Sequence, residues 1–526
     1  MGQYRRSTAV MASPQILVVG SLVILALGIF LPLAELLRRG LGAASEIPIW
    51  GDPFYRRVLA FTYGQAFLSS CCAMALGIPT AFVFSECEFP GKRILWRISL
   101  VSFSLPTLLG VLGWVAFWGR QGWVNRLLSG DMSLYGWPAI LMVHTFFNFP
   151  IFLRGVYTAW QGSGRGEEWM SLSLGASRWT CFWDVTWRKI LPAVRSAFVL
   201  CFLYCSASFL IVLLLGGGPR FTSVETAVYQ AIKVDFDLPL AVRFSLIQIV
   251  LGAAVYGLLL GKRTPLAAWD PRGRFAPLYF TQSRRLRWIA VGSVWIALFM
   301  LVIGPLAALE VGGWEGLNRM PWAAFGRSMK VSLILAVASA GGSLLLALPM
   351  VYVCRHRQPW VRSIERIALF PLMTSSLVLM LALWFAYPQV LVGFRGSLWP
   401  VGLVQAIVIL PLGFRTLRDG WDGIADDLVR VSHSLGAGPW RTLWHTELPL
   451  LKPSLVLALL FGMALSFGEV AAAMMFLSGE EIPLSFRIYR LFAQYRIAEA
   501  LAMGSLLLIV MVVLYGVIER VEKWNL

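Results

Sequence analysis

The residues that commonly perform chemistry are scattered through this sequence without the spacing that chemistry requires. Seven cysteines form no CxxC pair and lie mostly within apolar runs, which is typical of small buried side chains. No nucleophile–base pair stands out, and no GxxxxGK[ST] phosphate-binding loop occurs. The four histidines are not spaced like metal ligands; they are His144, His356, His433 and His445. We therefore expect no catalytic residue, no metal site and no cofactor bound by this chain.

One ionisable residue lies within an apolar segment, where such residues usually have a functional role. Glu469 lies within LSFGEVAAAMMF, an apolar stretch of the kind that spans a membrane. Ionisable side chains in such segments usually mark a substrate or ion pathway, so we predict that Glu469 faces one. Pairing with another polar residue of a helix bundle explains it about equally well. Gln65, His144, Asn148 and Gln248 also lie in apolar segments and could equally form interhelical hydrogen bonds.

The composition indicates a membrane protein. Of 526 residues, 58% are apolar and 14% are charged, whereas ordinary globular domains carry about 25% charged residues. The mean hydropathy is +0.72. A soluble fold could not bury so much apolar surface, which excludes a soluble enzyme, and a disordered chain is excluded by the same numbers. The net charge of +18 then indicates Lys and Arg in cytoplasmic loops rather than nucleic-acid binding.

Twelve apolar segments can be followed along the chain, each long enough to cross the hydrocarbon layer. They are continuous rather than alternating, which favours helices over barrel strands. The sequence therefore predicts an all-α polytopic membrane protein with about 12 transmembrane helices. The segments lie near residues 15–37, 57–85, 95–118, 134–160, 191–216, 239–262, 285–311, 326–354, 365–392, 398–420, 450–477 and 497–520.

The distribution of basic residues predicts the orientation. With the N-terminus in the cytoplasm, 29 of the 45 Lys and Arg residues fall on the cytoplasmic side. We therefore expect a multi-pass protein of the bacterial inner membrane with both termini in the cytoplasm.

The chain contains an internal repeat. Residues 150–192 align without a gap to 411–453, at an offset of 261, and 12 of the 43 positions are identical. We predict a first repeat of six helices (1–262), a cytoplasmic linker (263–284) and a second repeat of six helices (285–526). The two repeats have parallel topology, which predicts a pseudo-twofold axis along the membrane normal with a pathway between them.

Each repeat carries one long polar segment on its cytoplasmic side, at 165–190 and 422–449. Both contain Ser-Leu-Gly-Ala, with Gly175 or Gly436 as the glycine. We expect a short helix, a turn at the glycine and a second helix, which together could dock a soluble partner. An ordinary amphipathic interfacial helix is the alternative.

These two segments resemble the "EAA" coupling loops of ABC importer permeases. The family pattern is E-A-A, three residues, Gly, nine residues and Ile-x-Leu-Pro. In the second repeat Leu448 and Pro449 follow Gly436 at the expected spacing, whereas the first repeat has Trp187 and Arg188 there. The E-A-A itself is degenerate in both repeats.

The resemblance implies a type I ABC importer transmembrane domain that works with other subunits. It implies two copies of a separate ATPase, which uses ATP and Mg, and a periplasmic binding protein that delivers a small-molecule substrate. This chain would then not be an enzyme. The resemblance assigns ATPase coupling to Gly175, Ala176, Trp179, Gly436, Ala437, Trp440, Leu448 and Pro449.

Within that family, the sequence is most similar to thiamine permeases, which fuse two six-helix halves in one chain. The stretches that carry this resemblance are GQAFLSS (64–70), FPGKR (89–93), GRQGW (119–123), HTFFNFP (144–150) and LGGGPRFTSVETAVYQAI (215–232). They imply import of thiamine and its phosphates, and the related ferric-iron permeases are the second choice. An ion-driven secondary transporter, a different class, also fits twelve spans in two parallel halves but does not need the two polar segments.

Overall fold

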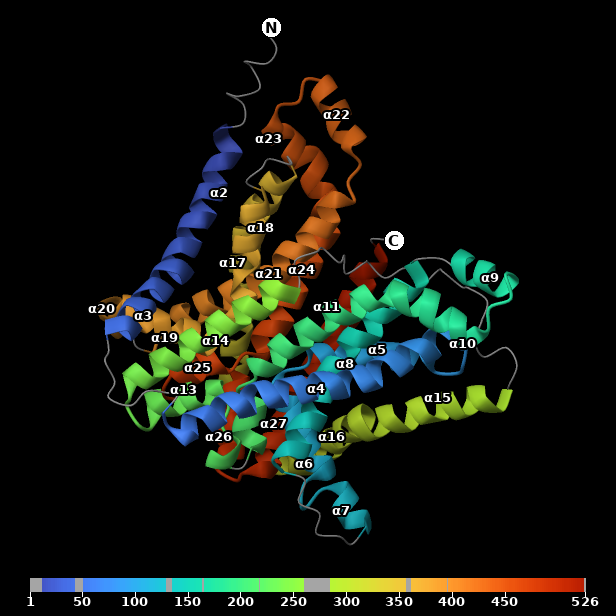
Figure 1. Ribbon diagram of the computed structural model, residues 1–526. Coiled ribbons are helices and arrows are strands. Elements are labelled where there is room, and N and C mark those ends of the chain that lie inside the picture. The colour runs from blue at the N-terminus through green and yellow to red at the C-terminus, as the bar shows by residue number, and fades with distance from the viewer. Residues whose placement is uncertain are drawn as a thin grey trace. The chain divides into compact units, whose positions relative to one another are not determined.

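The computed structural model describes residues 12–42, 51–128, 135–162, 165–216, 218–259, 284–355, 361–394 and 396–524, and every regular element in these ranges is a helix (Figure 1). Ten helices are long and apolar enough to cross a membrane. Two bent pairs of helices, broken near residues 105 and 375, raise the number of possible spans to 12. The predicted all-α polytopic fold is thus confirmed. The predicted linker lies outside the described residues, except for Arg284.

The described helices fall into two compact units. One, here called the α4 unit, also contains the first part of α13 and the later part of α14. Its elements are α4 (Pro53–Glu86), α5 (Lys92–Ser104), α6 (Thr107–Trp118), α7 (Trp123–Leu128), α8 (Trp137–Gly162), α9 (Gly166–Ser173), α10 (Arg178–Cys181), η2 (Phe182–Thr186), α11 (Trp187–Ser206), α12 (Leu210–Leu215), η3 (Pro219–Phe221), α13 (Val224–Lys233), α14 (Leu238–Leu259), α15 (Arg284–Leu298), η4 (Phe299–Ile303) and α16 (Gly304–Gly316).

The other unit, here called the α17 unit, contains the rest of α13 and α14 and the helices at both ends of the chain. Its elements are α2 (Ala12–Leu25), η1 (Ala26–Phe30), α3 (Leu31–Gly42), η5 (Leu317–Arg319), α17 (Trp322–Cys354), α18 (Val361–Leu369), η6 (Phe370–Met373), α19 (Ser376–Ala386), α20 (Pro388–Gly393), α21 (Trp399–Asp422), α22 (Asp426–Ser434), α23 (Pro439–Thr442), η7 (Leu443–Glu447), α24 (Leu448–Gly468), α25 (Ala471–Phe476), α26 (Leu484–Ala493) and α27 (Ile497–Trp524).

The first helix of each half packs with helices of the other half. In the α17 unit, α2 packs against α17 and α3 against α19, and the Tyr387 hydroxyl donates to the Leu27 carbonyl at 2.9 Å. In the α4 unit, α16 packs against α6, and the Trp118 indole donates to the Met300 carbonyl at 3.2 Å. The compact units therefore differ from contiguous halves of the chain. The predicted repeat boundaries concern duplication of the sequence and stay a prediction.

Both units are built on the same core of three helices. In the α4 unit, α4, α8 and α11 pack against one another, and in the α17 unit α17, α21 and α24 do the same (Figure 1). Each of these six helices contains one interior proline, and the prolines form pairs at offsets of 261 or 270: Pro79 and Pro349, Pro150 and Pro411, Pro192 and Pro453. This correspondence supports an internal duplication.

Other local features recur in pairs as well. The π-helical segment η1 interrupts the first helix of the chain, and η4 interrupts the first helix of the second half. A hydroxyl on the second helix of each half accepts from the first N–H of a short helix. Thr62 Oγ1 does so for Val224 in α13 at 2.9 Å, and Ser332 Oγ for Leu484 in α26 at 2.7 Å. Such paired side-chain acceptors satisfy helix-terminal groups that have no intrahelical partner.

Helices α4 and α8 meet at a glycine, which yields the first prediction. A Cβ on Gly77 would lie 2.5 Å from Phe152 Cβ and 2.8 Å from the Phe149 carbonyl oxygen, whereas a Cβ on Gly64 of the same helix meets nothing within 4 Å. We expect Gly77→Ala to destabilise the protein by about 1–3 kcal/mol through overpacking. Gly64→Ala is the matched control and should leave the thermal unfolding midpoint in detergent unchanged or slightly raised. Equal midpoints for both variants would contradict this packing.

Candidate functional site

The first polar segment forms the predicted helix, turn and helix. Helix α9 ends in a turn in which the Gly175 N–H donates to the Leu172 carbonyl at 3.0 Å and the Ala176 N–H donates to the Ser171 carbonyl at 3.2 Å. This is the Schellman pattern, which requires a left-handed residue, and Gly175 has φ +89°. After the turn, α10, the π-helical η2 and α11 form one continuous helix.

The second polar segment repeats this geometry. The Gly436 N–H donates to the His433 carbonyl at 3.0 Å, the Ala437 N–H donates to the Ser432 carbonyl at 3.1 Å, and Gly436 has φ +83°. The following α23, η7 and α24 start 261 residues after α10, η2 and α11, and the π-helical segments coincide residue for residue. Short π-helical segments are frequent at functional sites. The two predicted coupling segments thus share one backbone structure.

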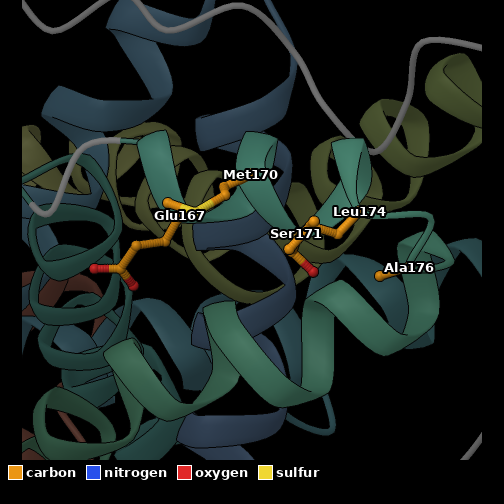
Figure 2. A pocket seen from close by; sticks show the side chains of 5 residues that line it. All are labelled: Glu167, Met170, Ser171, Leu174 and Ala176. Carbon is orange, nitrogen blue, oxygen red and sulfur yellow. The ribbon is translucent and has the colours of Figure 1, made fainter.

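The turns present apolar side chains at their surfaces. Leu174 and Leu435, which precede the two glycines, are 82% and 83% exposed. Trp179 and Trp440 are also exposed. The sequence interpretation named both tryptophans but missed both leucines, although the shared Ser-Leu-Gly-Ala stretch contains them. A groove lies at the first turn, and Figure 2 shows the side chains that line it: Glu167, Met170, Ser171, Leu174 and Ala176.

The structure divides the predicted coupling residues into three places. Gly175 and Ala176 lie in the first turn with Trp179 at the start of α10, and Gly436 and Ala437 lie in the second turn with Trp440 in α23. Leu448 and Pro449 lie beyond η7, as the first two residues of α24. The coupling role of all these residues stays a prediction.

A buried carboxylate holds the first coupling helix against the continuous helix that follows it. Glu168 of α9 is 1% exposed. Its Oε2 lies 3.0 Å from Lys189 Nζ in α11, and its Oε1 accepts from Thr186 Oγ1 in η2 at 3.4 Å. The helix α9 has only eight residues, too few to be stable alone. Its position therefore depends on tertiary links of this kind.

The polar residues within the first core join its three helices. Gln65 Nε2 in α4 donates to the Cys205 carbonyl in α11 at 2.7 Å, and Ser69 Oγ in α4 lies 3.0 Å from His144 Nδ1 in α8. Asn148 Nδ2 donates to the His144 carbonyl at 2.8 Å and to Cys205 Sγ at 3.4 Å. These contacts favour the interhelical role that was one of the two alternatives for Gln65, His144 and Asn148.

The second core has a hydrogen-bonded cluster at corresponding positions, built from other residue types. Gln405, which follows His144 by 261 residues, accepts at Oε1 from Ser339 Oγ at 3.0 Å and from Ser466 Oγ at 2.6 Å. These residues come from α21, α17 and α24. Gln248 is placed differently, because its Nε2 donates to Glu225 Oε1 between α14 and α13.

Glu469 lies where two interrupted helices meet. It directly follows the last residue of α24, and its Oε1 accepts from the Ala472 N–H of α25 at 3.2 Å. The same oxygen accepts from Ser376 Oγ at 2.8 Å. Ser376 begins α19, just after the 102° bend that follows α18 and η6. Transporters often bind substrates at such breaks in membrane helices. Glu469 therefore has a structural partner, and its carboxylate also stands at a candidate binding position.

Comparisons with known proteins place this architecture in a class. A family model described as "Binding-protein-dependent transport system inner membrane component" matches residues 344–524. The chain is 30% identical over 527 residues to the thiamine transport system permease protein ThiP of Salmonella typhimurium, which covers 94% of this chain and 95% of that protein. It therefore belongs to the family of membrane permeases of binding-protein-dependent ABC importers.

Two further relatives refine the comparison. The ThiP protein of Escherichia coli is 29% identical over 507 residues, with 91% of each chain covered. A putative 2-aminoethylphosphonate transport system permease protein, PhnV of Salmonella choleraesuis, is 26% identical over 274 residues, which is 49% of this chain and 97% of that protein. A permease of that length thus corresponds to about half of this chain.

Family membership carries several of the predicted properties with it. The relatives are transport permeases, and permeases of this family work with an ATPase and a substrate-binding protein. The long apolar helices and the permease relatives together identify a multi-pass inner membrane protein. The orientation of the termini stays a prediction.

The turn at Gly436 yields a test of the second coupling segment. A Cβ there meets nothing within 4 Å, so Gly436→Ala acts only through the left-handed backbone conformation, at a cost of about 1–2 kcal/mol. If this strain reduces the favourable free energy of ATPase binding by the same amount, the ATPase subunit should bind roughly 5- to 30-fold more weakly in co-purification. Gly436→Asn should be milder because Asn tolerates this conformation.

Gly438 provides the matched control for this turn. It has φ −73°, and a Cβ there also meets nothing within 4 Å. Gly438→Ala should therefore leave ATPase binding at the wild-type level. Equal loss of binding in Gly436→Ala and Gly438→Ala would contradict the role of the turn geometry.

Proposed function

We propose that this chain forms the membrane pathway of an ATP-driven importer of thiamine and its phosphates. The observation that carries this proposal is that similarity to thiamine transport permeases extends over more than 90% of the chain. It therefore includes both repeats and not only the coupling segment common to many permeases. The shared fusion of two halves in one chain supports the same substrate class.

We further propose that two copies of one ATPase dock at the two coupling segments. The equal turns at Gly175 and Gly436 and the equal exposure of Leu174 and Leu435 support two equivalent docking surfaces. ATP and Mg would be used on the ATPase. Closure of the ATPase dimer would move the two segments, and the pathway would open alternately to the outside, where a binding protein delivers substrate, and to the cytoplasm.

Two other functions fit part of the sequence pattern. An ion-driven secondary transporter would not need duplicated coupling segments, and membership in an ABC permease family favours the ATP-driven mechanism. A ferric-iron permease would share the ATPase and the two halves. The thiamine permease relatives make thiamine the preferred substrate.

Uptake by the reconstituted complex tests the proposal. In vesicles that contain the permease, its ATPase and its binding protein, labelled thiamine should accumulate only with ATP inside the compartment that holds the ATPase. Dissipating the ion gradients should not change this uptake, because no ion flow drives it. Excess unlabelled thiamine should compete with the label, and a ferric complex should not. ATP-independent, gradient-dependent uptake would identify a secondary transporter, and competition by iron would identify the alternative substrate.

Glu469 is the residue we propose to contact the substrate. The thiazolium ring of thiamine is cationic, and a carboxylate at a helix break suits a cation held within the membrane. Oε1 accepts the hydrogen bonds from Ser376 and Ala472, and the Ala471 N–H also interacts with the carboxylate. The carboxylate can therefore keep its structural bonds while its charge stabilises a passing cation.

The substitution Glu469→Gln separates these two roles. The amide oxygen can still accept from Ser376 and Ala472, so the fold should be kept, while the negative charge is lost. A hydrogen-bonded charge is worth about 1.5–3 kcal/mol, so thiamine uptake at low concentration should fall roughly 10- to 100-fold. Glu315→Gln, an exposed carboxylate in α16, is the control. Normal uptake by the Glu469→Gln variant would remove Glu469 from the pathway.

A further inference from the structure

The residue that precedes coupling helix α9 is linked to the end of membrane helix α4. Arg165 Nη2 lies 2.6 Å from Glu86 Oε1 and also donates to the Ser85 carbonyl at 3.4 Å. Glu86 is the last residue of α4. The two charged side chains are 3% and 0% exposed, so this ion pair is shielded from solvent.

The neighbouring thiol reports the same shielding. Burial, together with the nearby negative charge of Glu86, raises the pKa of the Cys87 thiol to about 11. The thiol is therefore neutral at physiological pH. In surroundings of this kind the attraction between the two charges is little screened, and removing one partner leaves an uncompensated buried charge.

The second half makes a corresponding link. Arg355, which directly follows α17, has its Nη2 3.3 Å from Asp426 Oδ1 at the start of α22. The Asp426 side chain is 80% exposed, so this pair is more open to solvent than the first. Its Nη1 lies 3.2 Å from Glu447 Oε1 in η7. One arginine thus connects the membrane helix, the coupling helix and the π-helical segment.

The two links join corresponding elements of the two halves, with the charges exchanged. Asp426 follows Arg165 by 261 residues, the offset of the coupling segments. Arg355 follows Ser85 by 270 residues, the offset that relates Pro79 to Pro349, and so stands one position from the counterpart of Glu86. The acidic residue is on the membrane helix in the first half and on the coupling helix in the second. Both halves therefore have an ion pair between these two elements, but the acidic and basic residues are exchanged.

We propose that these ion pairs are clamps that make each coupling helix move together with the adjacent membrane helix, α4 or α17. The inference rests on the proposed ATP-driven mechanism, and Arg165 and Glu86 act in it as positioning residues. Helix α9 is too short to keep its place alone. Glu168 fixes it to α11 and Arg165 fixes it to α4, so a displacement of α9 reaches both membrane helices.

Reversing the charges of the first clamp tests this proposal in the complete complex. The single variants Arg165→Gln and Glu86→Gln should lower thiamine uptake per ATP hydrolysed by about tenfold or more, the equivalent of 1.4 kcal/mol. The ATPase should remain bound. The double variant Glu86→Arg/Arg165→Glu gives the first half the polarity of the second and should restore the ratio to within about threefold of wild type. Arg165→Lys keeps the positive charge and should retain most of the wild-type thiamine uptake per ATP hydrolysed.

A second measurement does not depend on the substrate. Hydrogen exchange of the α9 amides, recorded without thiamine, should be faster in the single variants and return toward wild type in the charge-reversed variant, because the clamp limits local opening. If the wild-type complex imports no thiamine, the substrate proposal fails and this measurement still decides on the clamp.

Arg496→Gln is the control for loss of an ion pair, because Arg496 pairs with Glu499 at the exposed start of α27. It should leave both measurements unchanged. Wild-type coupling and wild-type exchange in Arg165→Gln would overturn the clamp. So would the failure of both Arg165→Lys and the charge-reversed variant to restore coupling in protein that unfolds at the wild-type temperature.

Discussion

In hydrocarbon, every backbone N–H and C=O must find a partner within the protein, and the described helices follow from that requirement. Long uninterrupted helices meet it by themselves. At several helix ends a side chain supplies the missing acceptor: Ser375 accepts from the Val378 N–H, Glu469 from the Ala472 N–H, and Thr62 and Ser332 from short helices. These interruptions thus stand where polar side chains support them, and a helix break is also a position at which a permease can bind substrate or change shape.

A backbone constraint also explains the two coupling segments. A turn that reverses the chain directly after a helix needs a residue with positive φ, and glycine supplies it without strain. The turn leaves a leucine exposed on each segment, and the continuous helix that follows carries a π-helical segment at the same position in both halves. The duplication is therefore visible in one local structure, in which both turns have glycine at the left-handed position while many neighbouring residues differ.

Much of this structure could be predicted from the sequence, and the exceptions have physical reasons. The apolar runs predicted the spans, and the glycines predicted the turns, since few residues other than glycine adopt that conformation. The exchange of first helices was not predicted, because hydropathy does not specify which helices pack together. The roles of Gln65 and His144 needed distances to resolve. Arg165 was missed because its counterpart, Asp426, has the opposite charge, and an alignment counts this pair as a mismatch.

The opposite polarity of the two clamps has a consequence for how a duplicated chain assembles. Two similar coupling helices and two similar membrane helices allow two sets of partners, and only one set is correct. In the wrong set, Glu86 would face Asp426 and Arg165 would face Arg355, like charge against like. Such contacts are repulsive, and the cost falls mainly on Glu86 and Arg165, which are buried, whereas the Asp426 side chain is 80% exposed. The exchange of charges between the two halves thus favours pairing of each coupling helix with the membrane helix of its own half.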